Sequence, residues 1–175
     1  MFQVFKRGFH TSRPVLGYLK GINPLLSADL LRVLRSAGHG DEIAIVDGNF
    51  PAASTALDCV EEDVIQMAGA DAVQSLDAIC AHFPLDYFDE NPVLYMSPSK
   101  GTDYPDLGKQ VHTEGNAVIS EHSPGINIQP LERFAFYSRA KEAYAIVQAS
   151  GERRPYGNWI LKKGCIGQDG KDLKP

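Results

Sequence analysis

The sequence has few of the residues from which disulfide frameworks and structural metal sites are built. Its three cysteines, Cys59, Cys80 and Cys165, are widely separated and match no metal-binding spacing. This argues against a small secreted scaffold held together by disulfides. An odd number of scattered cysteines is typical of reduced thiols in a cell interior, so we interpret all three as small structural hydrophobic residues.

Long hydrophobic runs and a positive charge surplus are also absent. No apolar stretch approaches the ~20 residues of a membrane-spanning helix, so we expect no membrane partner. Lysine and arginine number 17 against 22 acidic residues, for a net charge of −5, and no basic stripe carries interleaved aromatic residues. A nucleic-acid partner is therefore not expected.

Signals for bound cofactors are missing as well. The chain has no phosphate-binding loop of the GxxxxGK type, and the spacing of His82, His112 and His122 does not suggest a metal site. We treat these three histidines as surface or core-edge residues. The sequence thus predicts that neither a cofactor nor a metal ion is needed.

The remaining composition is that of a globular chain, with 43% apolar and 22% charged residues. A length of 175 residues favours one domain with a sizeable core. We divide the chain into a candidate targeting leader at 1–16, a folded domain at 17–166 and a flexible, Gly-, Asp- and Lys-rich tail at 167–175.

Residues 1–16 differ from the rest because they contain basic, hydroxyl and phenylalanine residues but no acid. That composition is typical of a mitochondrial presequence. A disordered leader, or an artefact of the choice of start codon, is the alternative interpretation.

Hydrophobic periodicity predicts helices that alternate with short strands. The expected helices are 27–38, 72–83 and 130–143, with a weaker one near 105–115, and the expected strands are 43–46, 57–60, 92–96, 144–149 and 158–161. We expect the loop after residue 50 and the stretches 97–108 and 120–130 to be irregular. This alternation predicts an α/β fold: a single three-layer domain with helices on both faces of a central sheet.

The stretch 27–51 contains the first candidate site. Ser27 can cap a helix that Gly38 ends, and a buried strand follows, with His39 before it and Asp47 after it. An imidazole and a carboxylate at the ends of a rigid strand are suited to proton transfer. The alternatives are ordinary ones: a histidine beside a helix end commonly caps it or is solvated, and an aspartate after a strand commonly forms a turn.

Three separated blocks in the same order carry a family resemblance. They are GHGDEIAIVDGNFP at 38–51, ERFAFYSRAKEAYAIV at 132–147 and YGNWILKKG at 156–164. Together they resemble the L-fucose mutarotase branch of the family that it shares with D-ribose pyranase. The resemblance extends from about residue 19 to residue 164, and the stretch 100–130 matches least well.

The resemblance implies a cofactor-free carbohydrate isomerase that interconverts the α and β anomers of L-fucose and related monosaccharides. It also implies a homo-oligomer with sugar sites near subunit interfaces, and a cytoplasmic location unless residues 1–16 act as a mitochondrial presequence. Carried over by position, the proposed catalytic residues are His39, as proton donor, Tyr137 and Tyr156, and the proposed substrate-binding residues are Asp47, Asp86, Met96, Arg133 and Asn158.

These residue types fit the chemistry. Mutarotation opens the sugar ring by placing a proton on the ring oxygen and removing one from the anomeric hydroxyl, and closure reverses both transfers. Histidine and tyrosine can exchange protons, while carboxylate and amide groups hold the other hydroxyls. Two alternatives remain: interconversion of pyranose and furanose forms of ribose, and a sugar-binding protein without turnover.

Overall fold

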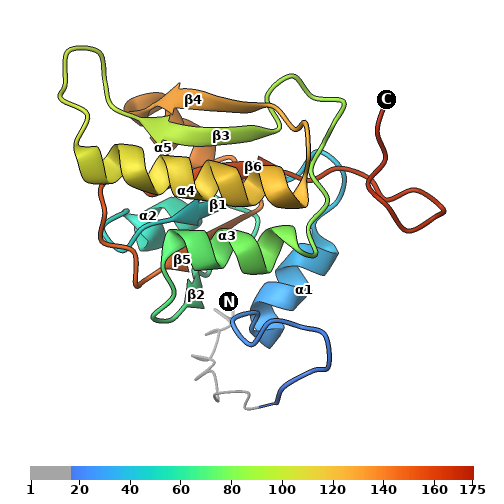
Figure 1. Ribbon diagram of the computed structural model, residues 1–175. Helices are drawn as coiled ribbons and strands as arrows, with labels where there is room; N and C mark the ends of the chain where they lie inside the picture. Colours follow the sequence, from blue (N-terminus) through green and yellow to red (C-terminus); the bar gives the residue numbers. More distant parts are fainter. Residues whose placement is uncertain (1–16) are drawn as a thin grey trace, which may run out of the picture.

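A six-stranded mixed sheet forms the centre of the structure, a computed structural model that describes residues 17–175 (Figure 1). The sheet order is β2-β5-β1-β6-β3-β4. The strands are β1 (Glu42–Val46), β2 (Ile65–Met67), β3 (Val93–Ser97), β4 (Ile128–Glu132), β5 (Ala145–Ala149) and β6 (Trp159–Lys162). The candidate targeting segment 1–16 lies outside the described residues.

The direction of β6 determines which strand termini lie at each of the two edges that run across the strand ends. β6 runs antiparallel to both of its neighbours, β1 and β3, whereas every other neighbouring pair is parallel. The carboxyl ends of the other strands therefore meet at one edge, together with the amino end of β6. We call this the carboxyl edge, and the opposite one the amino edge.

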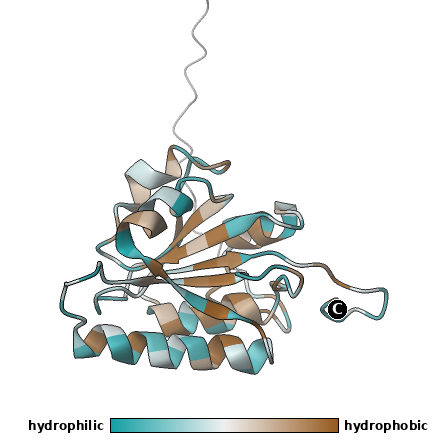
Figure 2. Cartoon of the chain, turned by 90° about the horizontal axis from the view of Figure 1, so that it is seen from above, coloured by the Kyte–Doolittle hydropathy of each residue, from teal (hydrophilic) through white to brown (hydrophobic). Residues whose placement is uncertain are grey.

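Helices cover both faces of this sheet, which confirms the predicted three-layer α/β fold (Figures 1 and 2). The helices are α1 (Ala28–Ser36), α2 (Ala52–Ala56), α3 (Ala72–Cys80), α4 (Asp106–His122) and α5 (Arg133–Ala140). One core packs α1, α3 and α4 against the sheet, and the other packs α2 and α5. β1 serves both cores, because Ile43 and Ile45 point to the first while Ala44 and Val46 point to the second.

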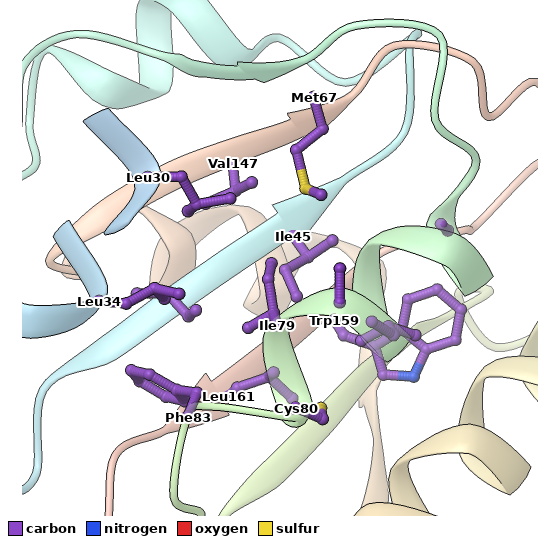
Figure 3. Close-up of a cluster of buried hydrophobic side chains, with 14 of the residues drawn as sticks. Leu30, Leu34, Ile45, Met67, Ile79, Cys80, Phe83, Val147, Trp159 and Leu161 are labelled. Carbon is purple, nitrogen blue, oxygen red and sulfur yellow. The ribbon is translucent and has the colours of Figure 1, made fainter. Parts of the chain in front are cut away.

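The first core is the larger of the two, and Figure 3 shows its centre. Leu30 and Leu34 of α1 extend toward the sheet, where Ile45 and Val147 lie. Trp159 at the start of β6 is fully buried in the same core. Burial of such side chains typically stabilises a fold by about 1.5–3 kcal/mol each, so β1 is anchored by packing on both of its faces.

Local signals explain several element boundaries. The Ser27 side chain accepts from the Leu30 backbone N–H and caps α1 as predicted, and Asp71 and Gln74 form a capping box on α3. The Glu132 side chain accepts from the backbone N–H groups of Phe134 and Ala135 and so starts α5. Cys59 and Cys80 are buried as expected, whereas Cys165 is half-buried.

The structure corrects the prediction in four places. Residues 57–60 form a turn with Leu57 and Val60 exposed, and the strand in this region is β2 instead. The small residues after Pro51 form α2, and α4 continues to His122. Residues 128–132 form β4, so the helix predicted from Pro130 begins only at Arg133. β4 pairs with a neighbour on one side only, where a proline is tolerated, and its weak apolar pattern hid it.

Among the described residues, no helix combines the length and the apolar character needed to cross a lipid bilayer.

After β6 the chain forms a small turn in which Ile166 bridges Asp172. Lys174 then lies 4.2 Å from the ring centroid of Tyr87. The flexibility of residues 167–175 stays a prediction.

We predict that Gly115→Ala destabilises the fold through overpacking. A Cβ at Gly115 in α4 would lie 2.5 Å from Cζ2 of Trp159 and 2.9 Å from Cδ1 of Leu76, both fully buried. Overpacking typically costs about 1–3 kcal/mol, whereas Gly→Ala in an open helix position stabilises by about 1 kcal/mol. The urea midpoint should therefore fall, while the exposed control Ser120→Ala on the same helix should leave it nearly unchanged. A midpoint that rises with Gly115→Ala would contradict the packing described here.

Candidate functional site

A pocket of about 310 Å³ opens at the carboxyl edge of the sheet. Its walls come from the end of β1, from β3, from the start of α5 and from the loop before β6. Six of the eight predicted site residues line it: Asp47, Met96, Arg133, Tyr137, Tyr156 and Asn158. The direction of β6 explains this convergence, because it brings the residues before β6 to the same edge as the residues after β1.

Asp47 and Asn158 form a buried pair in this pocket. The Asp47 backbone N–H donates to Asn158 Oδ1 at 2.9 Å, and Asn158 Nδ2 donates to Asp47 Oδ2 at 2.8 Å. Burial raises the pKa of Asp47, while hydrogen bonds from the Asn49 backbone and the Asn158 amide oppose that rise. Asn158 Nδ2 also lies 3.7 Å from the sulfur of Met96. The carboxylate and the amide are thus held in one orientation from which they can bind sugar hydroxyls.

Aromatic residues and an arginine form the side of the pocket next to α5. The Tyr137 and Phe50 rings lie 5.3 Å apart, and the Arg133 guanidinium lies 5.7 Å from the Tyr137 ring centroid. Interaction with Tyr137 raises the pKa of Arg133, which stays charged and exposed. This side combines an apolar ring face, a phenol and a cation, a combination suited to a polyhydroxylated ring.

Tyr156 has an unusual backbone conformation. Its φ of 66° makes it the one non-glycine residue in the range 17–175 with a left-handed backbone. The loop that carries it is held by Glu152, which is 2% exposed, accepts from the Ala72 backbone N–H at 3.2 Å and pairs with Arg154 at 2.7 Å. Strained conformations of this kind persist where the surroundings enforce them and are concentrated at functional sites.

His39 and Asp86 lie at the amino edge. His39 Nε2 is 3.1 Å from Asp86 Oδ2, and Asp86 Oδ1 accepts from the Phe88 backbone N–H at 3.0 Å. The Asp86 side chain is buried, whereas the His39 side chain is 54% exposed. An oriented, accessible imidazole of this kind can donate or accept a proton.

The structure thus brings six predicted residues together and separates the other two from them. His39 precedes β1 and Asp47 follows it, and a five-residue strand spans ~16 Å. Asp86 follows Leu85, which bridges Lys163 just after β6, again at the amino edge. Within one chain, the imidazole of His39 is therefore remote from Tyr137 and Tyr156.

A second, larger cleft of about 500 Å³ lies beside the loop that carries Tyr156. None of the predicted site residues lines it. Its most buried charges are already paired, since Arg154 lies 2.6 Å from Glu114 and 2.7 Å from Glu152. We therefore assign the candidate site to the smaller pocket.

Sequence reasoning missed some neighbours of the pocket and was wrong about His112. Phe50 and Pro155 line the pocket directly, and each stands within three residues of a predicted site residue. His112, expected at the surface or core edge, is 4% exposed and contacts Tyr104 and the carbonyl of Tyr156. No local pattern signals these contacts, because they form only when α4 packs over the loop.

Comparison with known proteins agrees with the resemblance carried by the three sequence blocks. The chain is 43% identical over 147 residues to an L-fucose mutarotase of Haemophilus influenzae (strain 86-028NP), covering 83% of this chain and 96% of the relative. It is 42% identical over 152 residues to the fucose mutarotase of Danio rerio, covering 85% of this chain and 94% of the relative.

A solved structure is similar as well. It is the fucose mutarotase of Streptococcus pneumoniae in complex with L-fucose, which matches with a TM-score of 0.73 and 36% identity over 85% of this chain and all of that one. Residues 20–166 match the model of a single protein family. The chain therefore belongs to the RbsD / FucU transport protein family.

Proposed function

We propose that this protein is an L-fucose mutarotase, an isomerase that interconverts the α and β anomers of L-fucose. One observation carries the proposal: a single pocket combines a buried carboxylate–amide pair with two phenols and an arginine. The relatives at 42–43% identity are named as fucose mutarotases, which supports this sugar.

The pocket residues have separate proposed roles. Asp47 accepts hydrogen bonds from sugar hydroxyls, Asn158 can donate and accept, and Arg133 donates. The apolar surface of Met96 contacts the ring. Tyr137 and Tyr156 place phenol groups near the anomeric centre, where one hydroxyl must lose a proton as the ring opens.

His39 is the proposed donor of the second proton, to the ring oxygen, with Asp86 orienting its imidazole. Histidine suits this role because its ordinary pKa lies near neutrality, so that it can release and recover a proton. A positioned acid–base group typically contributes about 10²–10⁴-fold. Uncatalysed mutarotation is only moderately slow, so a few such groups suffice.

We further propose a homo-oligomer in which His39 and Asp86 of one copy complete the pocket of another. This is supported by the separation of the two residue groups at opposite edges and by the exposure of the His39 side chain. A contact between the amino edge of one copy and the carboxyl edge of another is heterologous, since the two surfaces that meet are different. With a rotation between copies that closes, repetition of such a contact forms a ring in which every copy gains a complete site.

We predict that the wild-type protein accelerates α/β exchange of L-fucose and that His39→Ala removes most of this acceleration. Loss of one acid–base group should lower the rate by about 10²–10⁴-fold. Saturation-transfer NMR on equilibrated anomers measures the exchange directly. His82→Ala is the matched control because His82 is exposed and does not line the pocket, and its rate should equal the wild-type rate.

The same assay separates the alternatives. Exchange with ribose between pyranose and furanose forms, without fucose exchange, would replace the proposed substrate. Calorimetric binding of fucose without exchange would identify a sugar-binding protein instead. Unchanged exchange after His39→Ala would remove the proposed proton donor.

The shared site predicts that two inactive variants restore activity when mixed. We expect His39→Ala and Tyr156→Phe to be nearly inactive alone, because each disables a different half of the site. After subunit exchange in an equal mixture, about a quarter of the sites should combine two intact halves, and activity should return to a corresponding level.

The matched control mixes His39→Ala with Asp86→Asn, whose defects fall in the same half. That mixture should gain no such activity, because a site needs the intact pair from one copy. Equal recovery in both mixtures, or in neither, would contradict a site divided in this way.

For the location of the protein we propose the cytosol, although residues 1–16 have the composition of a mitochondrial presequence. We predict that a fluorescent reporter carrying residues 1–16 at its N-terminus stays in the cytosol. A reporter fused to residues 1–16 with all three basic residues replaced by glutamine is the control. Mitochondrial import of the first reporter, abolished in the second, would assign the presequence role.

A further inference from the structure

The backbone carbonyl of Tyr156 is bound from helix α4. His112 Nε2 lies 2.6 Å from this oxygen, which also accepts from the Asn158 backbone N–H at 2.7 Å. Because a carbonyl oxygen can only accept, the imidazole must carry its proton on Nε2. The other nitrogen of a neutral imidazole, Nδ1, is then left as an acceptor.

Tyr104 is the hydrogen-bond partner of this Nδ1 atom. Its hydroxyl contacts Nδ1 of His112, so the phenol is the donor, and the order of protons is fixed from Tyr104 through His112 to the carbonyl of Tyr156. Burial raises the pKa of Tyr104 to about 12. Burial also lowers the pKa of His112, against the opposing effect of its hydrogen bond to Tyr156. Both changes favour the uncharged forms that this order requires.

Packing leaves these groups little freedom. The His112 ring centroid lies 4.6 Å from that of Tyr95 and 5.4 Å from that of Trp159, and the residue is buried. At Gly108, one turn earlier in α4, a Cβ would lie 3.1 Å from Cε2 of Tyr104 and 3.2 Å from the carbonyl oxygen of Pro155. The amino-terminal half of α4 therefore presses directly on the loop that carries Tyr156.

We propose that Tyr104 and His112 are positioning residues for the reaction of the pocket. Neither side chain lines the pocket, but together they hold the carbonyl of Tyr156 and thereby keep this residue in its left-handed conformation. Tyr156 lines the pocket from that conformation. The inference rests on the proposed function, because it assigns to Tyr156 a role in proton transfer.

Three variants test the chain of hydrogen bonds. Tyr104→Phe removes only the hydroxyl, His112→Leu removes both ring nitrogens, and His112→Gln keeps an N–H donor for the Tyr156 carbonyl. Since small misplacements of a reacting group can cost about 10²-fold, we expect His112→Leu to lower kcat by 10- to 100-fold and Tyr104→Phe by a smaller factor. His112→Gln should recover most of the loss, and KM should change less than about threefold in all three.

His122→Leu is the matched control for His112→Leu. His122 lies on the same helix and binds Asp77 at 2.8 Å, away from the pocket, so its kcat should equal that of the wild type. Urea midpoints of all variants separate unfolding from misplacement. A kcat loss that merely follows the fall in midpoint, without recovery in His112→Gln, would overturn the proposal, as would wild-type kcat in both Tyr104→Phe and His112→Leu.

A measurement independent of activity keeps this inference separate from the proposed function. The ring ¹⁵N shifts of His112 should report a neutral imidazole protonated on Nε2, and the Nδ1 signal should move in Tyr104→Phe. If the wild type shows this signature but no anomer exchange, the proposed function fails while the hydrogen-bond order stands. An imidazole protonated on Nδ1 would overturn the order itself.

Discussion

The pocket depends on the two reciprocal hydrogen bonds between Asp47 and Asn158. They tie the end of β1 to the start of β6, two strands that are 111 residues apart at this point and adjacent in the sheet. Both side chains are buried, so removal of either partner would leave a buried polar group unpaired, at a typical cost of about 1–3 kcal/mol. This pair therefore fixes the distance between the proposed sugar-binding groups and the loop of Tyr156.

The same strand pairing explains why the proposed proton donor is elsewhere. Because β6 runs against β1, the residues before β6 join the residues after β1, and the turn that precedes β1 must lie at the opposite edge. His39 is therefore excluded from the pocket of its own chain by topology rather than by the orientation of a side chain. A mutarotase that uses His39 needs a second copy, so oligomer formation and activity are expected to be lost together.

Much of this architecture could be predicted from the sequence, and the failures have physical reasons. Helical periodicity and N-caps made α1 and α3 predictable, and a continuous apolar run made β1 predictable. In contrast, β2 and β4 have one strand neighbour each and weak apolar patterns. Five of the pocket residues could be predicted because they stand in three blocks that resemble one family in the same order, and Met96 followed from the same resemblance outside those blocks. Tyr104 and His112 could not, since their contacts depend on how α4 crosses the loop. The separation of His39 from the phenols required the direction of β6, which no local pattern encodes.

The two proposed halves of the site also differ in burial and in the number of contacts that hold them, and the proposed chemistry accounts for that difference. The strained backbone of Tyr156 is held in place by the hydrogen bond from α4 to its carbonyl and by a loop anchored on the buried Glu152. His39, in contrast, lies on an exposed turn with Asp86 as its partner. In the proposed oligomer, the exposed turn of one copy would cover the pocket of another, whose carboxylate–amide pair is held in place by its own hydrogen bonds. The proposed mechanism then requires that the imidazole reach the ring oxygen of a sugar whose other groups are already bound, and the uncatalysed reaction is only moderately slow.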